Sequence, residues 1–188
     1  MENQLQAELL RVRREARELY SLAQVDAAIK TMAAELGRDY AERDPLVITI
    51  MNGGLVLAGR LLPLLDFPLQ IDYLHASRYL GKTEGGSEIQ WIVTPRQSLA
   101  GRHVLILDDI LDVGSTLLAI IDTCRAQGAA SVATAVLVDK RHERKAAPDL
   151  RADYTALEVE DAYVFGCGMD YKHYWRNAPG IFAVREEN

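Results

Sequence analysis

The chain has 188 residues, of which 49% are hydrophobic and 26% charged, values ordinary for a single soluble domain with a full core. The formal net charge of −6 argues against a dedicated nucleic-acid binder or a protein that binds anionic membranes. The N-terminal residues lack the pattern of a signal or transit peptide, no apolar run reaches the length of a membrane span, and Cys124 and Cys167 form no CxxC motif. We therefore expect a cytoplasmic protein with reduced thiols.

Helices and strands are expected to alternate through the first half of the chain. Residues 3–20 carry apolar side chains at helical spacing, and Ser21 with Gln24 predicts a capping box for a second helix that runs to about Leu36 and stops at Gly37. A buried strand is expected over 45–51, a helix over 55–65 and a strand over 69–74.

The second half continues the alternation and then changes character. We expect a strand over 89–93, a strand over the apolar run 104–107, a helix over 115–127 and a strand over 131–139. Strands separated by helices predict a right-handed parallel sheet, whose carboxyl ends gather the functional site. Residues 148–188 alternate short apolar pieces with turns, and we expect them to form a small cap over that edge.

The most informative segment is residues 104–118. The apolar run Val104–Leu107 leads into Asp108 and Asp109, Asp112 follows, and Gly114-Ser115-Thr116 opens an amphipathic helix. Buried carboxylates are costly without partners, so we expect a ligand to compensate this acid pair. A helix start suits a phosphate, and paired carboxylates suit a sugar diol or Mg²⁺. Together these features describe a site for a phosphorylated ribose.

This segment closely resembles the phosphoribosyl pyrophosphate (PRPP) motif of the type I phosphoribosyltransferases. That pattern is an apolar run, two acids, two apolar residues, Asp, a small hydroxyl residue, Gly, any residue and Thr, and Val113 departs from it by lacking the hydroxyl. The resemblance implies an α/β, parallel-sheet fold with a Rossmann-like core over about 45–147 and a small hood made of the N-terminal helices and about 148–188. It implies that PRPP is bound by Asp108, Asp109, Asp112, Val113, Gly114, Ser115 and Thr116.

Two polar segments are expected to contribute to the same site. The loop Asn52-Gly53-Gly54 is on spacing alone a tight turn, but in the family this place holds the pyrophosphate loop, whose amides bind the diphosphate. Many purine enzymes carry Lys before the first Gly, so Asn52 is a departure. The glycine-rich segment 77–88, which contains Ser77-Arg78-Tyr79, is expected to close over the site as a lid.

Residues 140 and 163–176 resemble the bacterial hypoxanthine-guanine phosphoribosyltransferases. A strand-end lysine is normally solvated, but the resemblance implies that Lys140 donates to the purine O6. It implies that Tyr163 stacks on the base, that the Val164 backbone pairs with the base edge, that Asp170 holds a magnesium ion on the diphosphate, and that Arg176 contacts the diphosphate. Without the resemblance, a core tyrosine and a surface salt bridge would explain this block.

A basic run follows Lys140, from residue 140 to residue 145. Such a run could indicate RNA binding, but in an acidic protein we expect a solvated loop.

We interpret the chain as a purine-salvage transferase that converts hypoxanthine or guanine and PRPP to IMP or GMP and pyrophosphate. Asp112 is placed to accept the purine N7 proton and, with Arg176, is predicted to be catalytic; Mg²⁺ is expected at Asp108, Asp109 and Asp170. We expect a homodimer or homotetramer with no nucleic-acid or membrane partner. Three alternatives stay open: a transferase for xanthine or adenine, a PRPP-sensing or RNA-binding regulator of the same fold, and a phosphotransferase with an aspartate nucleophile.

Overall fold

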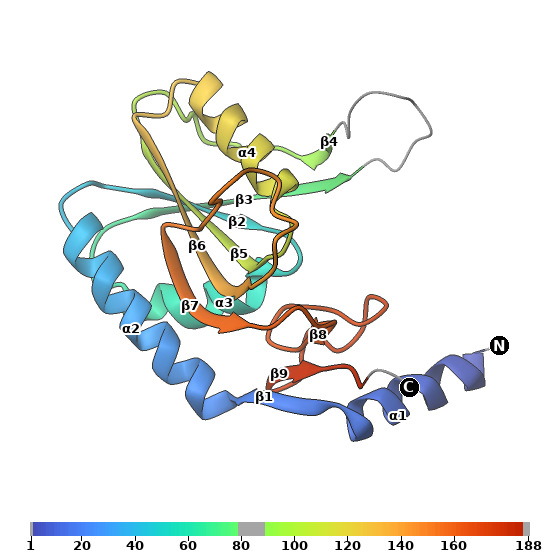
Figure 1. Ribbon diagram of the computed structural model, residues 1–188. Coiled ribbons are helices and arrows are strands. Elements are labelled where there is room, and N and C mark those ends of the chain that lie inside the picture. Colours follow the sequence, from blue (N-terminus) through green and yellow to red (C-terminus); the bar gives the residue numbers. More distant parts are fainter. Residues whose placement is uncertain (1, 79–88, 186–188) are drawn as a thin grey trace.

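The computed structural model describes residues 2–78 and 89–185, which form two β-sheets with helices packed around them (Figure 1). The larger sheet has six strands in the order β4-β3-β2-β5-β6-β7. Its strands are β2 (Leu46–Ile50), β3 (Gln70–Arg78), β4 (Ile89–Val93), β5 (His103–Leu111), β6 (Ser131–Lys140) and β7 (Tyr154–Val159). Each neighbouring pair is parallel except β3 and β4, which are antiparallel. The predicted α/β fold with a mainly parallel sheet is therefore confirmed.

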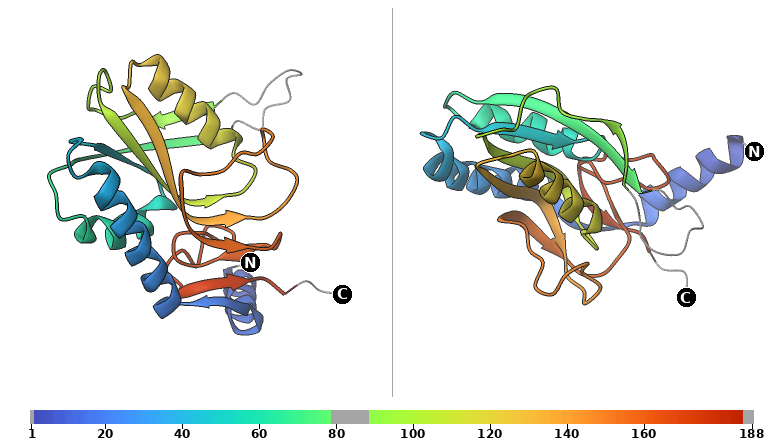
Figure 2. Two further views of the ribbon diagram at one scale, coloured as in Figure 1. Left: turned by 60° about the vertical axis from the view of Figure 1, so that its left-hand side comes forward. Right: turned by 90° about the horizontal axis from the view of Figure 1, so that it is seen from above.

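Helices cover both faces of the large sheet (Figures 1 and 2). One face packs against α2 (Leu22–Tyr40) and α3 (Gly54–Leu61), which η1 (Leu62–Leu64) extends, and the other packs against α4 (Ser115–Ala126). Because side chains alternate along a strand, Leu105 and Leu107 enter the first core while Val104 and Ile106 enter the second. A strand buried on both faces needs an unbroken apolar run, which explains residues 104–107.

The small sheet has the order β1-β9-β8, from β1 (Arg17–Ser21), β8 (Val164–Phe165) and β9 (Gly180–Ala183). It lies beside the large sheet, and α2 leads from β1 along both (Figure 1). The helix α1 (Glu2–Glu15) packs Val12 against Phe165 and Phe182. No helix among residues 2–78 and 89–185 is long and apolar enough to cross a membrane.

The structure corrects three predictions about element boundaries. The first helix ends at Glu15 rather than near residue 20, because residues 17–21 pair with β9 as a strand. Ser21 and Gln24 do form the predicted capping box, but α2 continues through Gly37 to the buried Tyr40. The large sheet also extends past residue 147, because β7 pairs with β6.

Candidate active site

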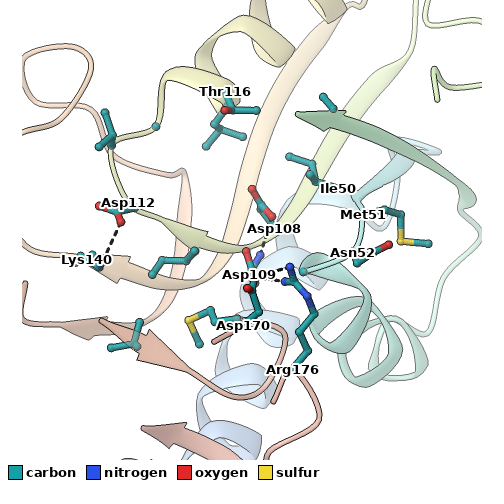
Figure 3. Close-up of a pocket in the computed structure, with 18 of the residues that line it drawn as sticks. Ile50, Met51, Asn52, Asp108, Asp109, Asp112, Thr116, Lys140, Asp170 and Arg176 are labelled. Atoms are coloured by element: carbon teal, nitrogen blue, oxygen red, sulfur yellow. Dashed lines mark hydrogen bonds and ion pairs between the residues drawn. The ribbon is translucent and has the colours of Figure 1, made fainter. Parts of the chain in front are cut away.

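A cavity of about 480 Å³ opens at the carboxyl ends of β2, β5 and β6 (Figure 3). The ends of these strands and the turns after them form one side, and residues 163–176 form the other. The predicted site residues that line it are Asn52, Gly53, Asp108, Asp109, Asp112, Val113, Gly114, Thr116, Lys140, Tyr163, Val164, Asp170 and Arg176. The cavity therefore joins segments that are far apart in the sequence.

The acid pair lies within β5, two residues before the strand ends, and not after it as the apolar run predicts. Asp109 is 8% exposed, and its backbone N–H donates to Asp108 Oδ1 at 2.9 Å. Burial, and after it the neighbouring charge of Asp109, raises the pKa of Asp108 well above the usual aspartate value. Burial also raises the pKa of Asp109, although the hydrogen bond with Asp108 and the charge of Arg176 oppose it. Both carboxylates thus lie where a ligand that compensates negative charge would bind.

The turn after β5 needs a glycine and leaves a helix start open. Gly114 has a φ of 85°, and a Cβ there would lie 2.5 Å from a Leu150 methyl carbon and 2.7 Å from one of Leu111. The N-cap residue Gly114 makes no side-chain capping hydrogen bond, and the positive end of the α4 dipole at this turn suits an anion. Thr116 lines the cavity, whereas Ser115 is not among the lining residues.

The loop after β2 packs directly on the acid pair. A Cβ on Gly53 would lie 2.0 Å from Asp109 Oδ2, and one on Gly54 would lie 2.8 Å from the Leu107 carbonyl oxygen. Gly168 approaches from the other side, where a Cβ would lie 2.4 Å from the Gly53 carbonyl oxygen. These glycines allow three backbone segments to meet at Asp109. The peptide bond between residues 51 and 52 is cis, which no sequence pattern indicated.

Asp112 receives two side-chain hydrogen bonds. Lys140 Nζ donates to Asp112 Oδ2 at 2.8 Å (Figure 3), and His142 Nε2 lies 2.7 Å from Asp112 Oδ1. Burial would raise the pKa of Asp112, but the hydrogen bonds from Lys140 and His142 outweigh it and lower this pKa. Asp112 is therefore an ionised acceptor at neutral pH, beside a lysine that is only 8% exposed.

The expectation that residues 140–145 form a solvated loop holds for Arg141, Glu143 and Arg144, which are exposed, and is wrong for Lys140, His142 and Lys145. The side chains of His142 and Lys145 are 4% and 6% exposed. Lys145 Nζ donates to Asp139 Oδ1 at 2.7 Å and to the carbonyl oxygens of Leu111 at 2.7 Å and Asp112 at 2.8 Å. All three ammonium protons are used, and the run folds under the turn that carries Asp112. The sequence missed His142 and Lys145 because their partners lie on the preceding strands.

On the opposite wall, Asp170 and Arg176 lie against the acid pair. Arg176 makes an ion pair with Asp170, donates to the Gly168 carbonyl oxygen at 2.7 Å, and places Nη1 3.6 Å from Asp109 Oδ2 (Figure 3). Asp170 also accepts the backbone N–H of His173 at 2.7 Å. This is an ion pair within the cavity rather than a surface salt bridge.

Tyr163 and Val164 form the rim and floor of that wall. Tyr163 is 54% exposed and packs edge-on against Tyr171 with a ring separation of 5.6 Å, so it is not a core tyrosine. Val164 is buried in β8. An exposed aromatic face next to strand backbone is a plausible surface for a planar base.

The predicted lid is only partly covered by the structure. Ser77 and Arg78 belong to the end of β3, where they pair with Gln90 and Ile89. Tyr79 and the rest of the segment to residue 88 lie outside the described residues.

The chain resembles known proteins over most of its length. The family profile described as phosphoribosyl transferase domain matches residues 15–173. The hypoxanthine-guanine phosphoribosyltransferase of Bacillus subtilis is 35% identical over 89% of this chain and 92% of its own. The protein of the same name from Streptococcus pneumoniae is 34% identical over 90% of this chain and 93% of its own.

Solved structures of the same class of enzyme are also similar to this chain. A hypoxanthine phosphoribosyltransferase from Staphylococcus aureus superposes with a TM-score of 0.83 at 30% identity, covering 90% of this chain and 91% of the other. A hypoxanthine-guanine-xanthine phosphoribosyltransferase superposes with a TM-score of 0.81 at 30% identity, covering 90% and 97%. The likeness therefore includes both the large sheet and the segments around the cavity.

Proposed function

The chain belongs to the phosphoribosyl transferase family, and from this premise we propose that it joins hypoxanthine or guanine to PRPP, forming IMP or GMP and pyrophosphate. One observation carries the choice of base. Lys140 Nζ and Asp112 Oδ2, a donor and an acceptor, lie 2.8 Å apart at one edge of the cavity. A 6-oxopurine presents the complementary pair, since its O6 accepts and its neighbouring N7–H donates. Adenine carries an amino donor at position 6, which would face the lysine.

The ribose phosphate binds along β5 and the start of α4. The backbone amides after Gly114 and the Thr116 side chain receive the 5′-phosphate, and Asp108 and Asp109 receive the ribose hydroxyls. The raised pKa values of these two aspartates mean that burial penalises their charge before the ligand arrives. Hydroxyl donors or a cation would offset that penalty.

The leaving diphosphate lies between the 52–54 loop and Arg176. The loop offers backbone amides and no charge of its own, because Asn52 stands where a lysine is common. Arg176 therefore supplies the positive charge on this side, and it moves from Asp109 and Asp170 toward the diphosphate. Stabilising negative charge that grows as the C1′–oxygen bond breaks lowers the barrier for this step.

Mg²⁺ fits the donor set as a partner that arrives with PRPP. Among the residues that the structure describes, no three or more His, Cys, Asp or Glu side chains converge to hold a metal alone. Magnesium usually takes one or two carboxylates together with substrate oxygens and water, and Asp108, Asp109 and Asp170 offer such carboxylates at the cavity. When bound, it neutralises part of the diphosphate charge.

The purine base is oriented and activated by residues on the opposite side of the cavity. Tyr163 covers one face of the ring, the Val164 backbone pairs with the N1–C2 edge, and Lys140 donates to O6. As N9 bonds to C1′, the purine must lose its N7 proton, and the ionised Asp112 accepts it. The reacting atoms are thus held in line by groups from both halves of the molecule.

We regard the chain as a single domain that acts in the cytoplasm as a homodimer or homotetramer. The exposed apolar side chains of Ile71, Tyr73 and Ile92, on β3 and β4, offer a surface for such an assembly. The negative net charge supports a small-molecule enzyme rather than an RNA-binding regulator.

Product formation tests the proposal directly. Purified protein with Mg²⁺ and PRPP is supplied with hypoxanthine, guanine, xanthine or adenine, and nucleotide formation is followed by absorbance and chromatography. We expect IMP and GMP to form readily and AMP poorly. Adenine as the best substrate would overturn the 6-oxopurine assignment, and PRPP binding without turnover of any base would favour the regulator alternative.

A further inference from the structure

His142 lies directly behind the proposed base, Asp112, and outside the cavity. Its Nε2 is 2.7 Å from Asp112 Oδ1, and its side chain is 4% exposed, whereas that of Asp112 is 43% exposed. Asp112 and Lys140 line the cavity, and His142 does not. The histidine therefore reaches the reaction only through Asp112.

The hydrogen bonds of His142 define its protonation. Nδ1 accepts the backbone N–H of Arg144 at 3.0 Å, so Nδ1 must keep its lone pair. The ring proton is then on Nε2, where it is donated to Asp112. His142 is thus a neutral donor, which orients the carboxylate without placing a full positive charge beside it.

Purine binding changes the other partner of Asp112. In the proposed reaction, which this inference takes as its basis, Lys140 turns from Asp112 Oδ2 to the purine O6. That movement frees Oδ2 and removes a hydrogen bond that lowers the pKa of Asp112. His142 then still donates to the other oxygen of this carboxylate, Oδ1.

The main chain of Asp112 is fixed independently. Lys145 holds the Asp112 carbonyl oxygen, and the Ala146 backbone N–H donates to the Val113 carbonyl oxygen at 2.8 Å. With the backbone clamped, the freedom left to the aspartate is rotation of its side chain. The His142 hydrogen bond restrains that rotation.

We propose that His142 is a positioning residue, whose uncharged Nε2–H keeps the Asp112 carboxylate turned so that Oδ2 accepts the N7 proton once Lys140 has moved to O6. The proton passes from purine N7 to Asp112 as N9 bonds to C1′ and the diphosphate leaves with the electron pair of the broken bond. His142 keeps its own proton throughout.

A double-mutant cycle tests this role. The variants are His142→Ala, Asp112→Asn and the two combined, with His142→Gln as the conservative variant because its amide N–H reaches toward the position of Nε2. His103→Ala is the matched control, because His103 is half-buried, makes a hydrogen bond to Ser131 at 2.8 Å, and lies at the opposite end of β5. Steady-state kinetics with hypoxanthine and PRPP gives kcat and each KM.

We expect His142→Ala to lower kcat about 10-fold to 100-fold, less than the full ~10²–10⁴ that a positioned general base contributes, with the KM for PRPP changed by less than about threefold. His142→Gln should recover most of the loss. In the Asp112→Asn background, His142→Ala should cause no further loss beyond about twofold, because residues that act as a unit are not additive.

Several results would overturn the role. An unchanged kcat in His142→Ala, a full additional loss in the double variant, or an equal loss in His103→Ala would each do so while the parent remains active. A parent inactive with every 6-oxopurine would instead remove the proposed function, and this inference with it. If His142→Ala does not fold, nitrogen NMR of the parent decides, because a ring protonated at Nδ1 rather than Nε2 contradicts the proposed hydrogen bond.

Discussion

Two groups of aspartates lie near the ends of neighbouring strands, and they differ in how far the protein itself compensates their charge. At the end of β5, Asp108 and Asp109 are pressed together with raised pKa values, and Arg176 lies 3.6 Å from only one of them. Asp139, at the end of β6, is matched by the buried Lys145, and Asp112, which follows β5 directly, is matched by Lys140 and His142. The first group is incomplete without a ligand, whereas the second is complete in the free protein.

This difference distinguishes aspartates placed to bind a ligand from aspartates that fix the local structure. A buried charge left uncompensated by the protein favours a ligand that can compensate it, and a buried charge already paired fixes local structure. The strand ends alone do not tell the two apart, since both carry aspartates. The two groups differ in whether cationic side chains of the protein pair with the aspartates.

The largest effect is expected at the acid pair. Replacing Asp108 and Asp109 together by Asn should lower kcat/KM for PRPP about 10²-fold to 10⁴-fold, because two charge-assisted contacts worth about 1.5–3 kcal/mol each are lost. The thermal midpoint should not fall, since the lost charges are buried and poorly compensated. Kinetics at limiting PRPP, with melting curves, measures both. Undiminished turnover at low PRPP would contradict the proposal that the acid pair binds PRPP.

For Asp139, whose charge is paired with Lys145, the expected effect is a loss of stability. Lys145→Met leaves the Asp139 charge buried and unpaired, and should cost about 3–5 kcal/mol of the free energy of unfolding. Adding Asp139→Leu should restore part of that loss, because no charge is then left unpaired. Arg141→Met, which removes an exposed partner of Glu158, is the matched control and should cost less than about 1 kcal/mol. Urea denaturation measures all three, and equal losses for Lys145 and Arg141 would contradict the distinction.

Lys140 belongs to both groups, because it pairs with Asp112 in the structure and is proposed to pair with the purine O6 in the complex. Lys140→Ala should lower kcat/KM for hypoxanthine about 5-fold to 150-fold, which corresponds to the loss of about 1–3 kcal/mol of transition-state stabilisation. The small activity with adenine should change little, so the ratio of the two activities is the measurement. A loss that is the same for both bases would mean that Lys140 only organises Asp112.

The smallest effect concerns pH. The folded state raises the pKa of Asp108, so its charge destabilises the free protein above that pKa, and the penalty disappears as the pH falls through it. Asp108→Asn keeps an acceptor for the Asp109 N–H and should therefore be more stable than the parent by about 1 kcal/mol at pH 8. The difference should shrink toward pH 5. A difference that grows on acidification has the wrong sign and would refute the burial argument.

The β5 segment was predictable because its features are local. An apolar run covered on both faces, a pair of acids and a glycine turn follow one another within residues 104–116, and the capping box at Ser21 is equally local. The prediction failed where the partner is remote. Residues 17–21 have a helical pattern, but they pair with 180–183, so tertiary pairing outweighs local preference.

The supporting residues behind the site were missed for the same reason. His142 and Lys145 look like part of a solvated basic run until the β5–β6 register places Leu111 opposite Asp139. That register brings the run under Asp112. The roles of Lys140 and Tyr163, in contrast, came from a resemblance to known enzymes, and composition alone would not have indicated them.

The small sheet has a consequence for the order in which the protein forms. Arg17 pairs with Ala183, so β1 is synthesised long before the strand with which it pairs. During synthesis, β2, β5 and α4 are already present when β8 and β9 emerge. The half proposed to bind ribose phosphate is thus made of early segments, and the half proposed to cover the base is completed by late ones. Long-range pairing of this kind is slow to form, so closing the small sheet is expected to be the last and slowest event in folding.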